Sequence, residues 1–434
     1  MFLPDRIESA FESFSNFMWG IPLVLLLLGG GAFFLIYSGL VPFRYFRHAI
    51  QVIRGKFDKK DDPGQINHFQ ALSTALASTI GMGNISGVAI AIATGGPGAI
   101  FWMWMSAFFG IATKYHTCSL AVMYRQKDEE GELQGGPMYV ITKGLGRNWR
   151  PLAIIFSLAG MIGVLPLFQV NQFNQALQDI VLTPFGIAGN WVNYAIGIML
   201  TGIAGFVIFG GIKRLGKISG KLVPIMVSIY FLSVIFILLT NPGQIIPSFG
   251  LIIKDAFTGQ AVLGGALGTL ILTGVRRGTF SNEAGLGTAP MAHAAAKTNE
   301  PIREGLVAMM GPAIDTLVVC TLTALALIIT GSWVDTSVDG ITMTAMAFEK
   351  GIPILGKEIL MLCVTIFAFT TLFAYPYYGT KCFTFVFGAK QKSIYRIIYL
   401  GAIFLATVAS MDAVINLVES HIPVLCILKL FIHE

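Results

Sequence analysis

The sequence has little charge. Only 12% of its 434 residues are Asp, Glu, Lys or Arg, whereas a typical soluble domain has about 25%. The apolar fraction is 55% and the mean hydropathy is +0.73, which excludes a soluble enzyme. The net charge is +6, but the basic residues are not clustered in a soluble domain. A nucleic-acid partner is therefore excluded as well. The composition predicts an all-α polytopic protein embedded in a lipid bilayer.

Patterns that carry catalysis or bind metals are also missing. The five cysteines are scattered singly, without a C-x-x-C pair or a Cys/His spacing that would hold a metal. Neither H-E-x-x-H nor G-x-S-x-G occurs, and the six histidines are dispersed. An intramembrane enzyme is therefore disfavoured. The acidic, amphipathic N-terminus predicts no cleaved signal peptide.

Long apolar stretches are abundant, and a membrane helix needs about 20 mostly apolar residues. We predict 11 such spans. They lie at 18–42, 71–98, 99–124, 152–180, 190–210, 222–240, 262–295, 305–330, 355–385, 393–410 and 412–432.

The basic residues between these spans alternate in number. Segments after the odd-numbered spans hold 21 Lys and Arg, and the segments on the opposite side hold 4. By the positive-inside rule the first set is cytoplasmic, which predicts an N-terminus outside and a C-terminus inside. Within the first set, the stretches FDKKDDPGQINHF and RQKDEEGELQGGP are expected to be loops.

The second and seventh spans share an interruption in the middle. Glycines there alternate with small polar residues, namely Gly81, Gly83, Asn84, Ser86 and Gly87 in one span and Gly278, Thr279, Ser281, Asn282, Glu283, Gly285 and Gly287 in the other. An unwound turn survives in hydrocarbon only where its backbone groups find partners. Its carbonyls can coordinate a cation and its helix N-terminus can receive a carboxylate. Close helix packing is the alternative explanation, but the pair favours a site for a zwitterion and a cation.

Four stretches resemble the alanine or glycine:cation symporter family. They read STIGMGNISGVAIAIATGGPGAIFWMW, GVRRGTFSNEAGLGTAPMAHAAAKT, QGGPMYVITKGLG and GPAIDTLVVCTLTAL. The resemblance implies the leucine-transporter fold, a 5+5 inverted repeat preceded by one additional N-terminal helix, in a prokaryotic plasma or inner membrane. Residues 1–70 would then hold the additional helix and a cytoplasmic loop, residues 71–240 the first repeat and residues 241–434 the second.

The resemblance also implies the substrate site. Amides freed by the first interruption would receive the substrate carboxylate, and Phe280 would cover the substrate. Gln169 keeps the side-chain amide that is expected to face the site. The expected substrate-binding residues are Thr79, Gly81, Met82, Gly83, Gln169, Phe280, Ser281, Gly285 and Tyr375.

Sodium is the implied coupling ion, and no cofactor is expected. One ion would be bound by Thr79, Asn84, Ser281 and Asp315 and a second by Ala77, Ile80, Phe367, Thr370 and Thr371. Neutral oxygen ligands suit a monovalent cation. The alternatives are structural. Asn84 would join two helices, Asp315 would bond Thr279 or Ser281, and the Thr370 and Thr371 hydroxyls would bond a carbonyl of their own helix.

Glu283 is a second acidic residue at membrane depth, where a carboxylate is costly and either paired or functional. Arg276 and Arg277 precede it by seven and six residues. A structural ion pair with one of them and a direct part in binding ion or substrate are both compatible with the sequence.

Two positions depart from the family pattern. Tyr375 stands where members usually have Trp, and the segment at 167–172 reads LFQVNQ instead of the common MVQANS. A larger or more polar pocket follows, so serine or glutamine joins alanine and glycine as an expected substrate. The predicted function is sodium-coupled symport of a small neutral L-amino acid into the cell by alternating access. The alternatives are proton coupling through Glu283 and Asp315, and an ion channel.

Overall fold

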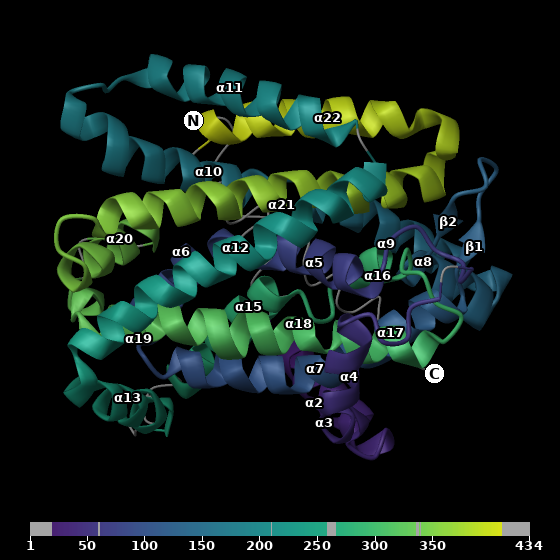
Figure 1. The fold of residues 1–434 in the computed structure, drawn as a ribbon, viewed down its shortest axis with the longest axis horizontal. Helices are drawn as coiled ribbons and strands as arrows, with labels where there is room; N and C mark the ends of the chain where they lie inside the picture. Colours follow the sequence, from purple (N-terminus) through teal and green to yellow (C-terminus); the bar gives the residue numbers. More distant parts are fainter. Residues whose placement is uncertain are drawn as a thin grey trace.

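The computed structural model is a bundle of helices (Figure 1). It describes residues 20–59, 61–209, 211–257, 266–335, 338 and 340–409. Long helices lie side by side along the longest axis, and α11 and α22 pack together on one face. Apolar side chains fill the space between the helices, as burial of most Ala, Val, Ile and Leu residues of α5, α6 and α19 demonstrates.

The longer helices of the described chain are α2 (Ile21–Tyr37), α4 (Phe46–Ile53), α5 (His68–Thr79), α6 (Met82–Gly95), α7 (Ala99–Met123), α9 (Arg150–Gly163), α10 (Leu167–Ala176), α11 (Asn190–Ile208), α12 (Gly211–Thr240), α13 (Ile245–Phe257), α15 (Ala266–Asn282), α16 (Thr288–His293), α17 (Pro301–Ala308), α19 (Thr321–Ile329), α20 (Gly340–Gly351), α21 (Gly356–Phe387) and α22 (Lys392–Val408). Short helices are α3 (Val41–Arg44), α8 (Pro137–Val140) and α18 (Met310–Pro312). Wider π-helical turns occupy Ile141–Leu145, Leu177–Leu182 and Ala313–Cys320.

Each of the first ten predicted spans overlaps at least one of these helices, and the eleventh, 412–432, lies outside the described residues. Five helical segments of the described chain are long and apolar enough to cross a membrane by themselves. They are Arg147–Phe185, Asn190–Ile208, Gly211–Thr240, Pro301–Ile329 and Gly356–Phe387. The bent pair of α5 and α6 adds a sixth. The chain is therefore a multi-pass membrane protein, and the number of 11 crossings stays a prediction.

Two charged segments outside the predicted spans have regular structure. Helix α12 begins at Gly211, 11 residues before the predicted span, because the basic segment is amphipathic. Ile212 and Leu215 are buried while Lys213, Arg214 and Lys217 face outward, which is helical spacing. The expected loop RQKDEEGELQGGP forms a hairpin of two short antiparallel strands, β1 (Gln126–Lys127) and β2 (Leu133–Gln134).

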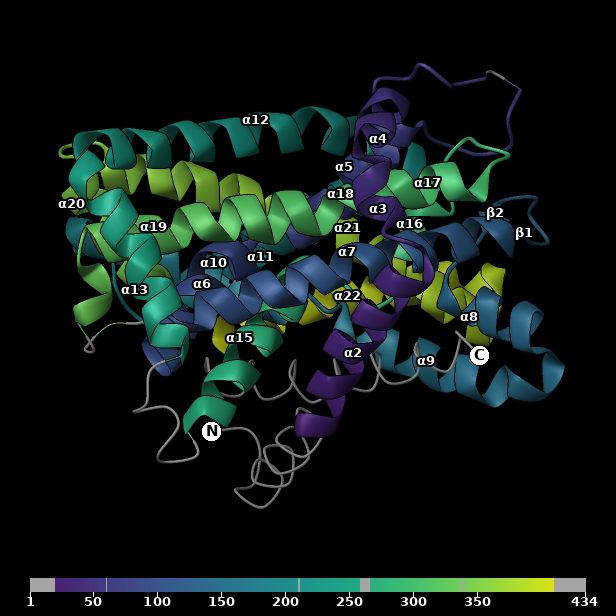
Figure 2. The ribbon, with the colours of Figure 1, turned by 90° about the horizontal axis from the view of Figure 1, so that it is seen from below.

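Helices α13 and α20 lie between predicted spans, where the hydropathy pattern predicted no element. Helix α13 packs against α7 and α19, and α20 packs against α6 and α21. Both are too short to be recognised as membrane spans. At the end of the bundle away from α13 and α20, Figure 2 shows the hairpin, α4 and α17. The same view shows that α2 crosses α7, on which it packs.

Both spans that were predicted to be broken are interrupted. Helices α5 and α6 are separated at residues 80–81 and bend by 41°. Helices α15 and α16 are separated by residues 283–287. Helix α6 packs directly on α15, and α5 packs on α16, so the two interruptions lie next to each other.

Candidate functional site

The first interruption is short and uncharged. Helix α5 ends at Thr79, Ile80 and Gly81 are extended, and α6 starts at Met82. The Gly81 amide donates a hydrogen bond to Oδ1 of Asn84 at 2.9 Å, so a side chain replaces the missing helical acceptor. The last carbonyls of α5 and the first amides of α6 lose their helical partners at such a break. They are the groups suited to a cation and to a carboxylate.

Asn84 also lies in a buried polar cluster that joins both interrupted spans. Its Nδ2 donates to Oδ1 of Asp315 at 2.7 Å, and the Ser281 hydroxyl donates to Oδ2 of the same carboxyl group at 2.8 Å. The Thr316 hydroxyl donates to Oδ2 as well, at 2.7 Å. Three residues predicted to bind one sodium ion are thus in contact. The same bonds satisfy the structural alternatives, so the ion-binding role stays a prediction.

A local irregularity of the helix positions Asp315. The residue lies on the π-helical segment Ala313–Cys320, directly after Pro312. Proline lacks the amide that an α-helix would use there, and single π-turns inside α-helices are frequent at functional sites. The carboxyl group is completely buried and faces Asn84 and Ser281.

The second interruption is longer and contains three residues in left-handed backbone conformations. Glu283 has φ +53°, Gly285 has φ +108° and Gly287 has φ +90°. Glycine adopts these angles freely, but a residue with a side chain is disfavoured there. The surrounding structure must therefore hold Glu283 in place.

Three hydroxyl groups hold the buried carboxyl of Glu283. They are Thr288 Oγ1 at 2.5 Å, Tyr375 Oη at 3.0 Å and Ser78 Oγ at 3.4 Å. Hydroxyls, rather than the guanidinium groups of Arg276 and Arg277, make these hydrogen bonds. Ser78 belongs to the last turn of α5, so the second interruption is bonded to the edge of the first.

Tyr375 connects Glu283 to Gln169. The Gln169 amide Nε2 donates to the Tyr375 hydroxyl at 3.2 Å, and this hydroxyl donates to Oε1 of Glu283 at 3.0 Å. A tryptophan at this position would only donate, because the indole has no acceptor. Oε1 of Gln169 is buried and has no hydrogen-bond partner among the described residues, so it remains available as an acceptor.

Aromatic rings cover the start of α6. A Cβ on Gly83 would lie 3.5 Å from the Phe280 ring, and Phe168 packs edge-on against Phe280 with ring centroids 5.2 Å apart. At the neighbouring turn, a Cβ on Gly81 would come within 2.7 Å of Thr371 Oγ1. Only glycine fits at position 81 without a shift of Thr371.

The residues predicted for the second sodium ion have local partners. The Thr370 and Thr371 hydroxyls both donate to the Phe367 carbonyl, at 2.9 and 3.0 Å, which is the structural alternative expected for them. Ala77 and Ile80 are buried at the end of α5. Their assignment as ligands stays a prediction.

Three further predicted residues lie at the interruptions. The Thr79 hydroxyl is 3.5 Å from the Leu76 carbonyl, Met82 is the first residue of α6, and Gly285 is in the middle of the second interruption. The structure therefore brings the predicted set into one region between α5, α6, α10, α15, α21 and the π-helical segment, and the roles of its members stay predictions.

Lys114 is a residue that the sequence analysis missed. It is only 2% exposed, in the middle of α7, and its ammonium group interacts electrostatically with Glu283 and Asp315. A signal was present, because a single lysine stands inside an otherwise uncharged apolar span. The Lys and Arg residues between the spans indicate orientation, whereas a lysine inside a span is a separate signal of function.

A second missed group is a buried His–Glu–His cluster. Glu304 at the start of α17 is bonded through its two carboxyl oxygens to Nδ1 of His68 and to Nδ1 of His293, the latter at 2.5 Å. His68 begins α5 and His293 ends α16. The histidines looked dispersed because 225 positions separate them.

Arg125 ties the same two helix ends together. Its guanidinium donates to the carbonyls of Pro63, Ala294, Ala296 and Thr298 at distances from 2.5 to 3.0 Å. The segment before α5 and the segment after α16 are thus held side by side at this end of the molecule.

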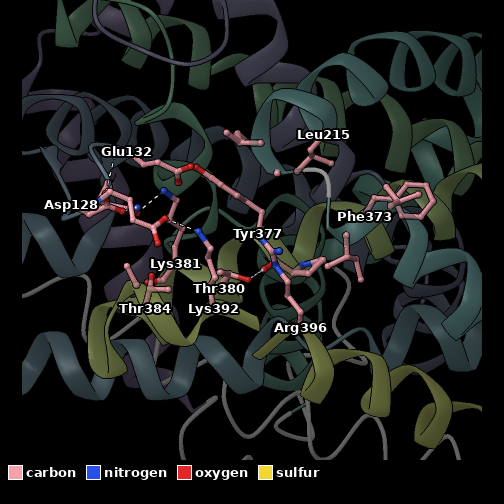
Figure 3. A pocket seen from close by; sticks show the side chains of 18 residues that line it. Asp128, Glu132, Leu215, Phe373, Tyr377, Thr380, Lys381, Thr384, Lys392 and Arg396 are labelled. Atoms are coloured by element: carbon pink, nitrogen blue, oxygen red, sulfur yellow. Dashed lines mark hydrogen bonds and ion pairs between the residues drawn. The ribbon is translucent and has the colours of Figure 1, made fainter. Parts of the chain in front are cut away.

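A cavity of about 110 Å³ lies elsewhere, beside the hairpin (Figure 3). Lys381 extends into it and donates to Oε1 of Gln134 at 2.5 Å and to the Leu133 carbonyl at 3.1 Å. Lys392 pairs with Glu130 at 2.6 Å. None of the residues predicted to bind substrate or sodium lines this cavity, and Lys381 and Lys392 already have partners. It is not the predicted site.

Pairs of interrupted helices that meet around buried oxygen ligands are typical of secondary transporters. The solved structure of MhsT in complex with L-phenylalanine has the same fold. Its TM-score is 0.60 over 85% of this chain and 88% of that chain, at 14% sequence identity. The fold is therefore that of a multi-pass membrane protein with the leucine-transporter architecture.

The model of the sodium:alanine symporter family matches residues 4–432, and the chain belongs to this family. The sodium/alanine symporter AgcS of Methanococcus maripaludis is 41% identical over 417 residues, which cover 95% of this chain and 91% of that protein. The probable sodium/glutamine symporter GlnT of Bacillus subtilis is 33% identical over 417 residues, 96% of this chain and 85% of that protein. The family resemblance inferred from the sequence is confirmed.

Proposed function

We propose that this protein carries a small neutral L-amino acid into the cell together with sodium. The observation that supports the proposal most is the contact between two interrupted helices through Asn84, Ser281 and Asp315. The first interruption offers amides to the substrate carboxylate, and the neighbouring oxygen atoms offer ligands to the ion. Cation and carboxylate stabilise each other, so each raises the affinity for the other and their movements are coupled.

The proposed architecture has eleven membrane helices. Helix α2 is the additional one, residues 71–240 form the first five-helix repeat and residues 241–434 the second, inverted one. The N-terminus is outside and the C-terminus is cytoplasmic, as the distribution of Lys and Arg indicates. The interruptions then lie near the bilayer midplane, where the two repeats rock to expose the site alternately.

The proposed substrate site consists of the amides around Gly81 and Gly83, the ring of Phe280 and the chain of polar groups from Gln169 through Tyr375. Alanine and glycine need only the first two features. The unpartnered Oε1 of Gln169 supports a substrate with a polar side chain, because a buried acceptor favours a donor. Serine and glutamine are therefore included.

Uptake into proteoliposomes tests the proposal. Under an inward sodium gradient we expect accumulation of at least one of alanine, glycine, serine and glutamine. Failure of all four would contradict the specific function. Proton coupling is the second candidate, since Glu283 and Asp315 are both buried. Replacing sodium with choline while a pH gradient is kept separates the two, because persisting uptake would remove sodium from the mechanism.

A channel makes a different prediction. Electrical recording would then detect current down an ion gradient without any amino acid. We expect charge movement only when substrate and sodium are present together.

A further inference from the structure

Lys114 sits beside both interrupted helices although it belongs to neither. One turn before it on α7, a Cβ on Gly110 would lie 2.7 Å from Ala284 Cβ and 4.0 Å from Pro312 Cγ. This face of α7 therefore packs on the second interruption and on the turn that precedes Asp315. Lys114 continues the face, and a Cβ on Gly311 would be 3.2 Å from its Nζ.

The neighbourhood of the Lys114 ammonium holds two acidic groups. Glu283 and Asp315 are the charged side chains that act on it in the described chain, and Cys118 contributes a thiol. All three charged residues are almost completely buried. An unpaired charge is costly in such surroundings, so the charges of the group have to be compensated locally.

The formal charges do not cancel. Two carboxylates and one ammonium leave one negative charge, which a single monovalent cation at Asp315 would neutralise. A zwitterionic amino acid adds no net charge. Without Lys114 the same site would be short of two positive charges.

We propose that Lys114 is a built-in counter-ion that offsets one of the two carboxylates and sets the affinity of the Asp315 site for sodium. It acts on the ion through space and is a positioning residue, not a sodium ligand. The inference rests on the proposed function in one respect, namely that sodium binds at Asp315.

Equilibrium binding of ²²Na⁺ to the purified protein tests the inference through four variants. As a general scale, two unit charges about 8 Å apart at an effective dielectric constant of about 20 interact strongly enough to change an affinity by about 30-fold. We therefore expect Lys114→Met to bind sodium at least about 10-fold more tightly. Glu283→Gln should bind it at least about 10-fold more weakly, and Lys114→Met should restore that variant to within about threefold of the wild type.

Lys381→Met is the matched control. This lysine is also buried in a membrane helix, but its partners are Gln134 and the Leu133 carbonyl, away from the interruptions. We expect its sodium affinity to be that of the wild type. A similar change in both lysine variants would overturn the proposal, because it would reflect general loosening of the fold.

The remaining outcomes are decisive as well. Unchanged sodium affinity in Lys114→Met, or a double variant no better than Glu283→Gln alone, contradicts the counter-ion role. If Lys114→Met does not fold, the double variant should fold, because it removes one charge of each sign, and failure of both overturns the proposal. A wild-type protein that binds no sodium would instead contradict the proposed function.

Discussion

The two interruptions solve the same structural problem with different chemistry. The first spans residues 80–81 and contains no charged side chain. Its Gly81 amide donates a hydrogen bond to the side-chain oxygen of Asn84. The second spans residues 283–287, carries Glu283 and needs three left-handed residues. The first thus presents backbone groups, whereas the second positions a charge. In the proposed function, the first interruption would receive the substrate carboxylate through its amides, and the second would add the negative charge of Glu283 beside it.

The largest expected effect is at Gly287. A Cβ there would meet Phe156 and Pro137 at 2.7 and 2.8 Å, and the residue has φ +90°. The cost of overpacking adds to the cost of placing a side chain on a left-handed backbone. Gly287→Ala should therefore destabilise the protein by about 3–5 kcal/mol. The midpoint of thermal unfolding in detergent measures the effect.

The matching change in the first interruption should be milder. In Gly81→Ala the new methyl group meets only the Thr371 hydroxyl, at 2.7 Å. A second change, Thr371→Ala, should therefore recover most of the lost stability. Phe156→Leu should not recover the stability lost in Gly287→Ala, because the unfavourable backbone angle at position 287 persists. Equal repair of both variants would contradict the difference between the two interruptions.

Asn84→Ala should weaken sodium binding by about 10-fold or more. It removes the hydrogen bond to the Gly81 amide and the one to Asp315, each worth about 1 kcal/mol or more. The sodium concentration that half-saturates substrate-induced stabilisation is the measurement. A wild-type sodium response would show that the site is misplaced.

Tyr375→Phe should change selectivity more than overall affinity. The variant keeps the ring but loses the link between Gln169 and Glu283. We expect the affinity for serine or glutamine to fall about five- to tenfold, because the loss of a neutral hydrogen bond costs about 1 kcal/mol. The affinity for alanine should change little. Competition assays against labelled alanine would check this, and parallel loss for all substrates would contradict a role in selectivity.

The smallest expected effect separates two adjacent threonines. Thr371 lies against Gly81, whereas the Thr370 hydroxyl contacts Phe367 and the sulfur of Met226. Thr371→Val should weaken sodium binding about threefold or more, and Thr370→Val should have less than half of that effect. The reverse order would place the second ion away from the first interruption.

The sequence predicted the two interruptions because glycine and small polar residues inside apolar spans are a local signal. The family resemblance grouped Asn84, Ser281 and Asp315 at one sodium site. The structure shows these side chains in contact, and their role as sodium ligands stays a prediction. The sequence did not predict the cluster of His68, His293 and Glu304, because contacts between distant segments leave no local pattern. The hairpin and the N-terminal extension of α12 were not predicted, because low hydropathy places a charged segment outside the membrane spans but does not distinguish a loop from a strand or an amphipathic helix.

Linkage between sodium and the amino acid is the most direct test of the account. If both occupy the paired interruptions at once, sodium must raise the affinity for alanine by the same factor by which alanine raises the affinity for sodium. We predict a factor of about 10 or more in each direction when the two affinities are measured on the purified protein. Equal alanine affinity in sodium and in choline would contradict the account.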